Sequence, residues 1–187
     1  MSDIMTPFGL AIDLETGDML AATNRLVRRA SDMRGYYADA EALDRLIQEQ
    51  DDPLHYEVYE LPVPQEQGQL MYCISKLQPG QVGQEFFMTK GHYHTISATA
   101  EIYLCLAGQG YMVMKTVEGQ WAAQEMMRGR MVYVPPYWAH RSVNTDANET
   151  LVSFCVYPGD AGHNYGDIER EGLGKRVLQR EGDIIFE

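Results

Sequence analysis

Two histidines separated by a single residue, His92 and His94, are the part of this sequence with the clearest chemical potential. On an extended segment, side chains at positions i and i+2 point to the same face, so both imidazoles can bind one ion. Glu101 opens the apolar run 101–106, which predicts a strand whose antiparallel pairing would bring the carboxylate beside the histidines. His140, 39 residues further along, is the fourth candidate ligand.

Three imidazoles and one carboxylate form a donor set for a single divalent cation, with room for two further ligands. Affinity order alone does not choose among Fe2+, Mn2+, Ni2+ and Zn2+. We expect Fe2+ or Mn2+, with Ni2+ or Zn2+ as alternatives. A cation of this kind acts on a bound substrate as a Lewis acid and a template. The four residues therefore predict one metal ion per subunit.

Composition limits the classes of protein to which the chain can belong. At 187 residues with 45% hydrophobic content, it can bury the core of one domain without crosslinks. Cys73, Cys105 and Cys155 each lie in an apolar run rather than at metal-ligand spacing, so we predict reduced core residues. A net charge of −12 argues against nucleic acid and anionic lipid as partners.

The N-terminal residues predict no targeting segment. They lack the charged and apolar regions of a secretion signal, and no apolar run approaches the roughly 18 residues that a membrane span needs. These patterns predict a cytoplasmic protein with no membrane association.

One long helix is predicted, over about residues 40–50. Asp39 is its candidate N-cap, Leu43 and Leu46 lie on its apolar face, and the Asp-Asp-Pro sequence at 51–53 ends it. Before the helix, turn residues at 16–18 predict a short hairpin.

Basic residues are scarce, so their clustering is informative. Arg25, Arg28 and Arg29 are interpreted as a solvated patch or a dimer-facing segment, with a phosphate-binding role as the alternative. Lys90 fits a phosphate partner and a solvated lysine equally well.

From residue 56 onward the hydrophobic period changes to two, which predicts strands separated by turns. Short, evenly spaced strands of this kind are typical of an all-β sandwich or barrel. The predicted strands are 56–61, 70–75, 85–88, 101–106, 111–114, 131–134 and 151–157, with a further edge strand at 182–187.

Two longer motifs contain the candidate ligands. They are His92-x-His94-x6-Glu101-x6-Gly108 and Gly129-x5-Pro135-x-Tyr137-x2-His140-x3-Asn144. Together they resemble the paired motifs of the cupin superfamily. They depart from the usual pattern in the long gap before Glu101 and in Tyr137, which stands where glycine is usual. These departures, with the runs 89–92, 133–141 and 157–166, resemble the cupin-type phosphoglucose isomerases.

This resemblance implies both a fold and a reaction. The fold is a cupin double-stranded β-helix (jelly-roll) barrel, all-β dominated, in a single domain over 1–187. Its parts are an N-terminal extension at 1–55, a barrel core at 56–166 and a tail at 167–187. The reaction is the interconversion of glucose 6-phosphate and fructose 6-phosphate by a homodimer with a divalent metal. The family's metal ligands fall here on His92, His94, Glu101 and His140.

The resemblance also assigns contacts to the sugar phosphate substrate. Tyr103 matches a sugar-contacting tyrosine, although by its strand position alone it would be a core or rim aromatic. Ser75 stands where relatives carry threonine, which keeps the hydroxyl donor. The phosphate contacts of the family fall on Ser75, Thr89, Gly91, Tyr157 and His163.

Aldose–ketose isomerisation requires a proton to leave C2 and return at C1 while negative charge collects on O1 and O2. Glu101 is the predicted base, acting through a metal-stabilised cis-enediol. A direct hydride shift from C2 to C1 is the alternative mechanism. The alternative functions are another metal-dependent cupin enzyme, such as a dioxygenase or decarboxylase, and a non-catalytic sugar-binding cupin.

Overall fold

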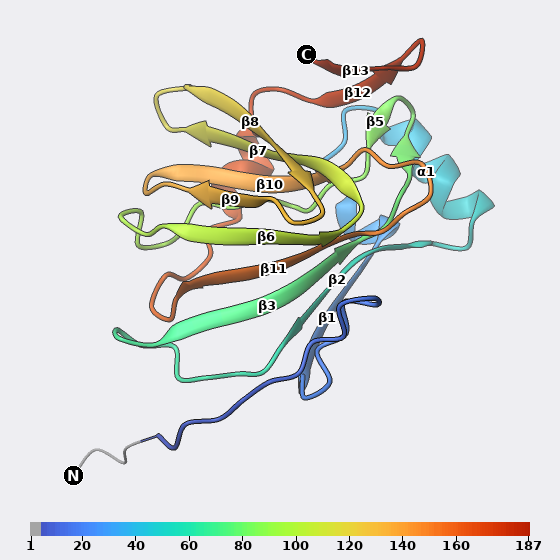
Figure 1. Ribbon diagram of the computed structural model, residues 1–187. Helices are drawn as coiled ribbons and strands as arrows, with labels where there is room; N and C mark the ends of the chain where they lie inside the picture. The colour runs from blue at the N-terminus through green and yellow to red at the C-terminus, as the bar shows by residue number, and fades with distance from the viewer. Residues whose placement is uncertain (1–4) are drawn as a thin grey trace.

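Two β-sheets face each other in the computed structural model, which describes residues 5–187 (Figure 1). The larger sheet has six strands in the order β1-β2-β3-β11-β6-β9, with antiparallel neighbours throughout. These strands are β1 (Asn24–Arg29), β2 (Leu54–Glu60), β3 (Leu70–Leu77), β6 (Glu101–Ala107), β9 (Met131–Val134) and β11 (Leu151–Pro158).

The second sheet has the order β10-β7-β8 and gains the extended segment 87–94 through single bridges to β10. Along the chain, β3, β6, β9 and β11 therefore alternate with the strands of the second sheet. This alternation is that of a jelly roll, and it confirms the predicted cupin-type β fold. The strands of the second sheet are β7 (Gln109–Thr116), β8 (Trp121–Met127) and β10 (Trp138–Asn144).

The main core fills the space between the two sheets. Residues of β9 alternate between exposed and buried positions, as expected when one face of a strand packs inward. Met71 and Leu77 of β3 meet Met112 of β7 and Leu151 of β11 there, each no more than 2% exposed. A second, smaller cluster lies on the outer face of the six-stranded sheet, where Met19 packs against Ile74 and Val152.

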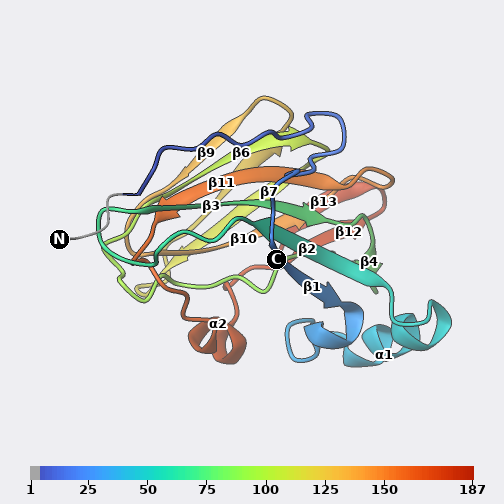
Figure 2. The same ribbon diagram turned by 90° about the horizontal axis from the view of Figure 1, so that it is seen from below.

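The N-terminal segment and the helices lie on different sides of the barrel (Figure 2). The predicted hairpin is present as a bridge between Ile12 and Met19. The predicted helix is α1 (Ala40–Glu49), where Asp39 accepts a hydrogen bond from the Ala42 amide at 2.8 Å. In residues 5–187, α1 is the longest helix, and no helix there is long and apolar enough to cross a membrane.

The C-terminal tail forms a small third sheet in the order β13-β12-β5-β4, with β13 at its edge. A short helix, α2 (Gly166–Glu171), precedes it. The strands of this sheet are β4 (Gln81–Val82), β5 (Glu85–Phe86), β12 (Val177–Arg180) and β13 (Asp183–Phe186).

A disulfide joins Cys73 of β3 to Cys155 of β11, so the prediction that all three cysteines are reduced is wrong. The two residues are direct partners in the antiparallel register, and their Cα atoms are 5.3 Å apart, within the range a disulfide spans. Cys105 is a buried free thiol, as predicted. The pairing of Cys73 with Cys155 depends on the register of β3 against β11, which cannot be read from the sequence.

Candidate active site

Four side chains from three parts of the barrel converge at one point. The candidate ligand atoms of His92, His94, Glu101 and His140 all lie within 4.8 Å of one another. The predicted antiparallel pairing of the histidine segment with the strand of Glu101 is wrong. His92 instead bridges to His140 in β10, and Glu101 pairs with Val134 of β9 and reaches across from the facing sheet.

Backbone carbonyls orient two of the imidazoles. Nδ1 of His94 lies 3.4 Å from the Thr99 carbonyl oxygen, and Nδ1 of His140 lies 3.4 Å from that of Trp138. When Nδ1 carries the proton and donates it to a carbonyl, the lone pair is on Nε2. The Nε2 atoms of both rings point toward Oε2 of Glu101, at 3.1 Å for His94 and 2.9 Å for His140.

The cluster fits a divalent metal ion. Nε2 of His92 and Nε2 of His140 are buried without a hydrogen-bond partner among residues 5–187, although the His140 atom is close to Glu101. Close approach without hydrogen-bond geometry is expected when lone pairs converge on a shared centre. A buried polar atom left unpaired costs about 1–3 kcal/mol, which a bound cation would offset. The imidazole and carboxylate donors suit first-row divalent metals.

The protonation states of the cluster also suit a cation. Burial alone would raise the pKa of Glu101, but the adjacent imidazoles of His140 and His94 hold that pKa well below its usual range. Burial lowers the pKa of His92 well below its ordinary value, and the neighbouring His140 lowers it further. An ionised carboxylate beside a neutral imidazole is the form in which these groups bind metals.

A hollow of about 250 Å³ opens above the cluster, and the sequence-predicted substrate contacts all line it. Tyr103 and Tyr157 are buried strand residues, and His163 lies at the mouth with its ring 4.4 Å from that of His92. The predicted contacts are Ser75, Thr89, Gly91, Tyr103, Tyr157 and His163. Their role in binding substrate stays a prediction.

Other lining residues were missed by sequence reasoning. Tyr56 and Tyr165 line the hollow, as do the two disulfide-bonded cysteines. Alternation along 56–61 could have placed Tyr56 and Val58 on one face, but nothing in the sequence indicated that this face is the pocket wall.

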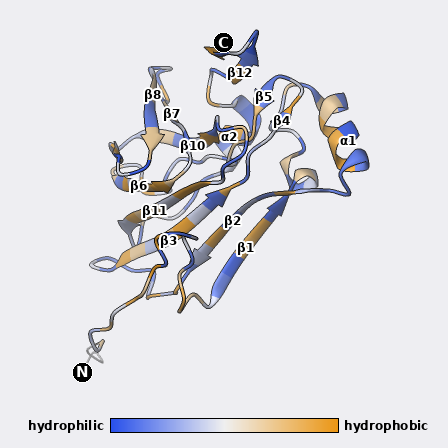
Figure 3. Ribbon diagram, turned by 45° about the vertical axis from the view of Figure 1, so that its right-hand side comes forward, coloured by the Kyte–Doolittle hydropathy of each residue, from blue (hydrophilic) through white to orange (hydrophobic). Residues whose placement is uncertain are grey.

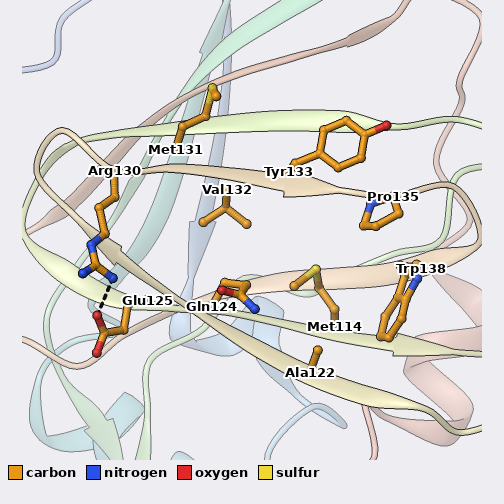
Figure 4. Close-up of a pocket in the computed structure, with 10 residues that line it drawn as sticks. All are labelled: Met114, Ala122, Gln124, Glu125, Arg130, Met131, Val132, Tyr133, Pro135 and Trp138. Atoms are coloured by element: carbon orange, nitrogen blue, oxygen red, sulfur yellow. Dashed lines mark hydrogen bonds and ion pairs between the residues drawn. The ribbon is translucent and has the colours of Figure 1, made fainter.

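A larger hollow of about 390 Å³ lies between β7, β8 and β9 (Figure 4). Its lining includes the apolar side chains of Met114, Val132 and Trp138, and an ion pair between Arg130 and Glu125 spans 2.5 Å beside them. It lacks the convergent donor atoms of the histidine cluster. We therefore place the active site in the smaller hollow.

The two departures from the usual cupin motifs meet in the structure. The extra residues between His94 and Glu101 form a loop in which the Ser97 carbonyl accepts a hydrogen bond from the Tyr137 amide at 2.7 Å. Tyr137 adopts φ +72°, the left-handed conformation that glycine usually supplies. In the same loop, the Ile96 amide donates to the Ala161 carbonyl at 3.0 Å, near His163. The longer loop thus ties together the segments that carry His140 and His163.

Comparison with known proteins agrees with this geometry. The family model described as glucose-6-phosphate isomerase (GPI) matches residues 27–185. The chain belongs to the glucose-6-phosphate isomerase family.

The matched region of this glucose-6-phosphate isomerase family member contains every candidate site residue. The glucose-6-phosphate isomerase of Thermococcus gammatolerans is 48% identical over 95% of this chain and 92% of its own length. The glucose-6-phosphate isomerase of Pyrococcus furiosus is 44% identical over 95% of this chain and 93% of its own length.

Solved structures are more distantly similar to this family member. An oxalate decarboxylase structure gives a TM-score of 0.46 at 20% identity, covering 57% of this chain and 26% of its own. A likeness at that level adds nothing to the assignment.

Proposed function

We propose that the protein interconverts glucose 6-phosphate and fructose 6-phosphate. The observation that carries the proposal is the convergence of three histidines and Glu101 at the base of a pocket, in a chain of the glucose-6-phosphate isomerase family. His92, His94, Glu101 and His140 would hold one divalent ion. When bound, such an ion polarises adjacent oxygens and stabilises charge on them by several kcal/mol.

Glu101 is the base in this proposal. Its Oε2 is the oxygen near both His94 and His140, which leaves Oε1 available to take the C2 proton and return it at C1. Burial raises the pKa of Tyr103 well above its ordinary value, and the nearby charge of Glu101 raises it further. The Tyr103 hydroxyl therefore stays neutral and can donate a hydrogen bond to the sugar. Glu101 is 2% exposed, which limits the access of bulk water to the transferred proton.

Hydroxyl and amide donors would hold the phosphate. The Thr89 hydroxyl oxygen already accepts from the Ser142 amide at 3.1 Å, so its own proton is free to donate. Gly91 adopts φ +75°, and a Cβ there would lie 3.0 Å from the His140 carbonyl oxygen, so only glycine leaves the backbone unstrained at this wall. Ser75, Tyr157 and His163 complete the predicted contacts.

The central test removes and restores the metal. Treatment with a chelator should abolish fructose 6-phosphate conversion, and separate addition of Fe2+, Mn2+, Ni2+ and Zn2+ should restore it to different degrees. We expect Fe2+ or Mn2+ to be most effective. Full activity after complete metal removal, verified by elemental analysis, would contradict the proposal.

Proton transfer through a cis-enediol is distinguished from hydride shift by running the reaction in deuterated water. The enediol route predicts solvent deuterium at C1 or C2 of the sugar. Complete absence of label at low conversion would favour the hydride shift.

We also infer a homodimer. Ile102, Met131 and Tyr133 lie on the outer face of β6 and β9, and the last two are more than half exposed. Exposed apolar side chains gathered on one sheet face are typical of an interaction surface. Light scattering after size-exclusion chromatography should give twice the 21.2 kDa chain mass.

A cytoplasmic location is a further part of the proposal. A sugar phosphate is charged and does not cross a lipid bilayer unaided, so its isomerase must work where the substrate is made. The single-domain organisation over 1–187 stays a prediction as well.

A further inference from the structure

The three arginines of β1 differ in their surroundings. Arg25 forms an ion pair with Glu57, and Arg29 donates to the Asp52 carbonyl at 2.8 Å. Arg28 has a buried Nε without a hydrogen-bond partner among the residues of the described chain. The middle of β1 is hydrophobic and both ends are hydrophilic (Figure 3). Arg28 is therefore the arginine that local contacts leave unexplained.

Strand alternation aims Arg28 toward the substrate pocket. Leu26, two residues earlier on the same face, lines the pocket. The partners of Leu26 and Arg28 on β2 are Val58 and Tyr56, and both also line it. Arg28 thus lies beside Tyr56, on the face of β1 that Leu26 presents to the pocket.

Lys90 brings a second cation to the same pocket. It lines the pocket between Thr89 and Gly91, and its Nζ lies 4.9 Å from the centre of the Tyr36 ring. Tyr56 connects the two cations, because it is the direct partner of Arg28 on β2 and lines the same pocket as Lys90. Within residues 5–187 no carboxylate oxygen lies within 4.0 Å of either cation.

A third cation supports the loop from below. Arg141 is 7% exposed, and its guanidinium donates to the Lys90 carbonyl at 2.7 Å. Its Nε lies 3.0 Å from where a Cβ on Gly91 would be, and it has no hydrogen-bond partner in the described part of the chain. Unpaired, partly desolvated cations are costly unless an anion joins them. In a chain of net charge −12, three such cations around one loop favour an anion site.

We propose that Arg28 and Lys90 bind the substrate phosphate directly, while Arg141 positions the Thr89–Gly91 loop beneath it. This inference rests on the proposed isomerase function and deepens it by naming the residues that select phosphorylated over free sugar. The hydroxyl and amide donors of the pocket fix the phosphate geometry, and the two cations supply the charge that the acidic protein otherwise lacks.

The test compares Arg28→Met and Lys90→Met with Arg29→Met, a matched loss of charge from the same strand. A charge-assisted hydrogen bond to phosphate predicts that KM for fructose 6-phosphate rises about tenfold to a hundredfold in the first two variants, with kcat changed by less than about threefold. Arg28→Lys should recover part of the loss. Arg29→Met should resemble the unmodified protein.

A binding measurement separates failure of this inference from failure of the proposed function. Calorimetry with inorganic phosphate on the metal-loaded protein should show weaker binding in Arg28→Met and Lys90→Met by a similar factor. If the unmodified protein binds phosphate but does not isomerise sugar phosphates, the proposed function fails and the anion site stands. If it isomerises normally and both variants keep its KM and phosphate affinity, the inference is overturned.

Discussion

Oε2 of Glu101 lies near both His94 and His140, and this asymmetry between the two carboxylate oxygens suits the two roles proposed for Glu101. In the proposal, Oε2 belongs to the ligand group and Oε1 takes the proton, in a residue that lines the pocket. A bound cation would reduce the basicity of the Glu101 carboxylate and would also make the C2 proton more acidic, so the two effects oppose each other.

Replacing Glu101 with glutamine should lower kcat at least a hundredfold, because the amide cannot accept the C2 proton. Calorimetry with fructose 6-phosphate should show binding within a few-fold of the unmodified protein, and elemental analysis should establish that metal is still bound. Glu60→Gln is the matched control, since Glu60 lines the same pocket without contacting a histidine. Near-normal turnover in Glu101→Gln would identify a different proton carrier.

His55 should make stability depend on pH. Its imidazole is fully buried beside the Tyr37 hydroxyl, at 2.8 Å, and burial lowers its pKa from 6.5 to about 3. Between these values the unfolded chain binds a proton that the folded chain does not. The neutral His55 imidazole therefore makes its full contribution to the free energy of unfolding above pH 6.5. This contribution is lost as the pH falls, by about 2 kcal/mol at pH 5. Urea unfolding should show a smaller difference in the free energy of unfolding between pH 7.5 and pH 5 for His55→Gln than for the unmodified protein.

At this scale the sequence revealed much of the candidate site. Spacing placed His92 and His94 on one face, because period-two alternation is a local property, whereas Glu101 reaches them from the facing sheet and not by the predicted pairing. The cations Arg28 and Lys90 were noticed but not assigned, since their common position depends on how β1 and the 89–91 loop meet. That meeting is set by tertiary packing.

Among the elements, the loop between His94 and Glu101 is the most distinctive. Its Ser97 carbonyl receives the Tyr137 amide, which fixes Tyr137 in the left-handed conformation just before β10. The turn thereby sets the residue at which β10 begins. It also sets the position of His140 along that strand.

Tyr137 should tolerate glycine better than a β-branched residue. Glycine relieves a strain of about 1–2 kcal/mol but increases the freedom of the unfolded chain by about 0.5–1 kcal/mol, so Tyr137→Gly should change stability by less than about 1 kcal/mol. Tyr137→Val should destabilise by about 2 kcal/mol, since a branched Cβ is a strong outlier there. Thermal unfolding of both variants checks the order. Equal stability of the two would show that backbone strain is not the governing effect.

Strand prediction succeeded where hydrophobic alternation was strong and failed elsewhere. β6 and β11 were predicted nearly residue for residue. β8 contains no β-branched residue, and β10 contains polar residues such as His140 and Arg141, so neither resembled a strand. In β10 these polar residues are buried because the site is there, which is where patterning is expected to fail.

For the molecule as a whole, the disulfide between Cys73 and Cys155 adds a long-range restraint to an antiparallel pair that already exists. Closing a loop of 82 residues should stabilise the fold by about 4.5 kcal/mol in the chain-entropy model. Urea unfolding with and without a reductant measures this difference. Cys105→Ala is the control, because its thiol takes no part in the bond. An unchanged midpoint on reduction would show that the restraint contributes nothing.

The same bond has a consequence for recovery from denaturation. His92, His94, Glu101 and His140 all fall between Cys73 and Cys155 in the chain. An oxidised polypeptide that has lost its sheets therefore still carries these four side chains on one closed ring, where each stays at a raised effective concentration with respect to the others. Renaturation of the oxidised form should recapture metal faster than renaturation of a reduced, linear chain.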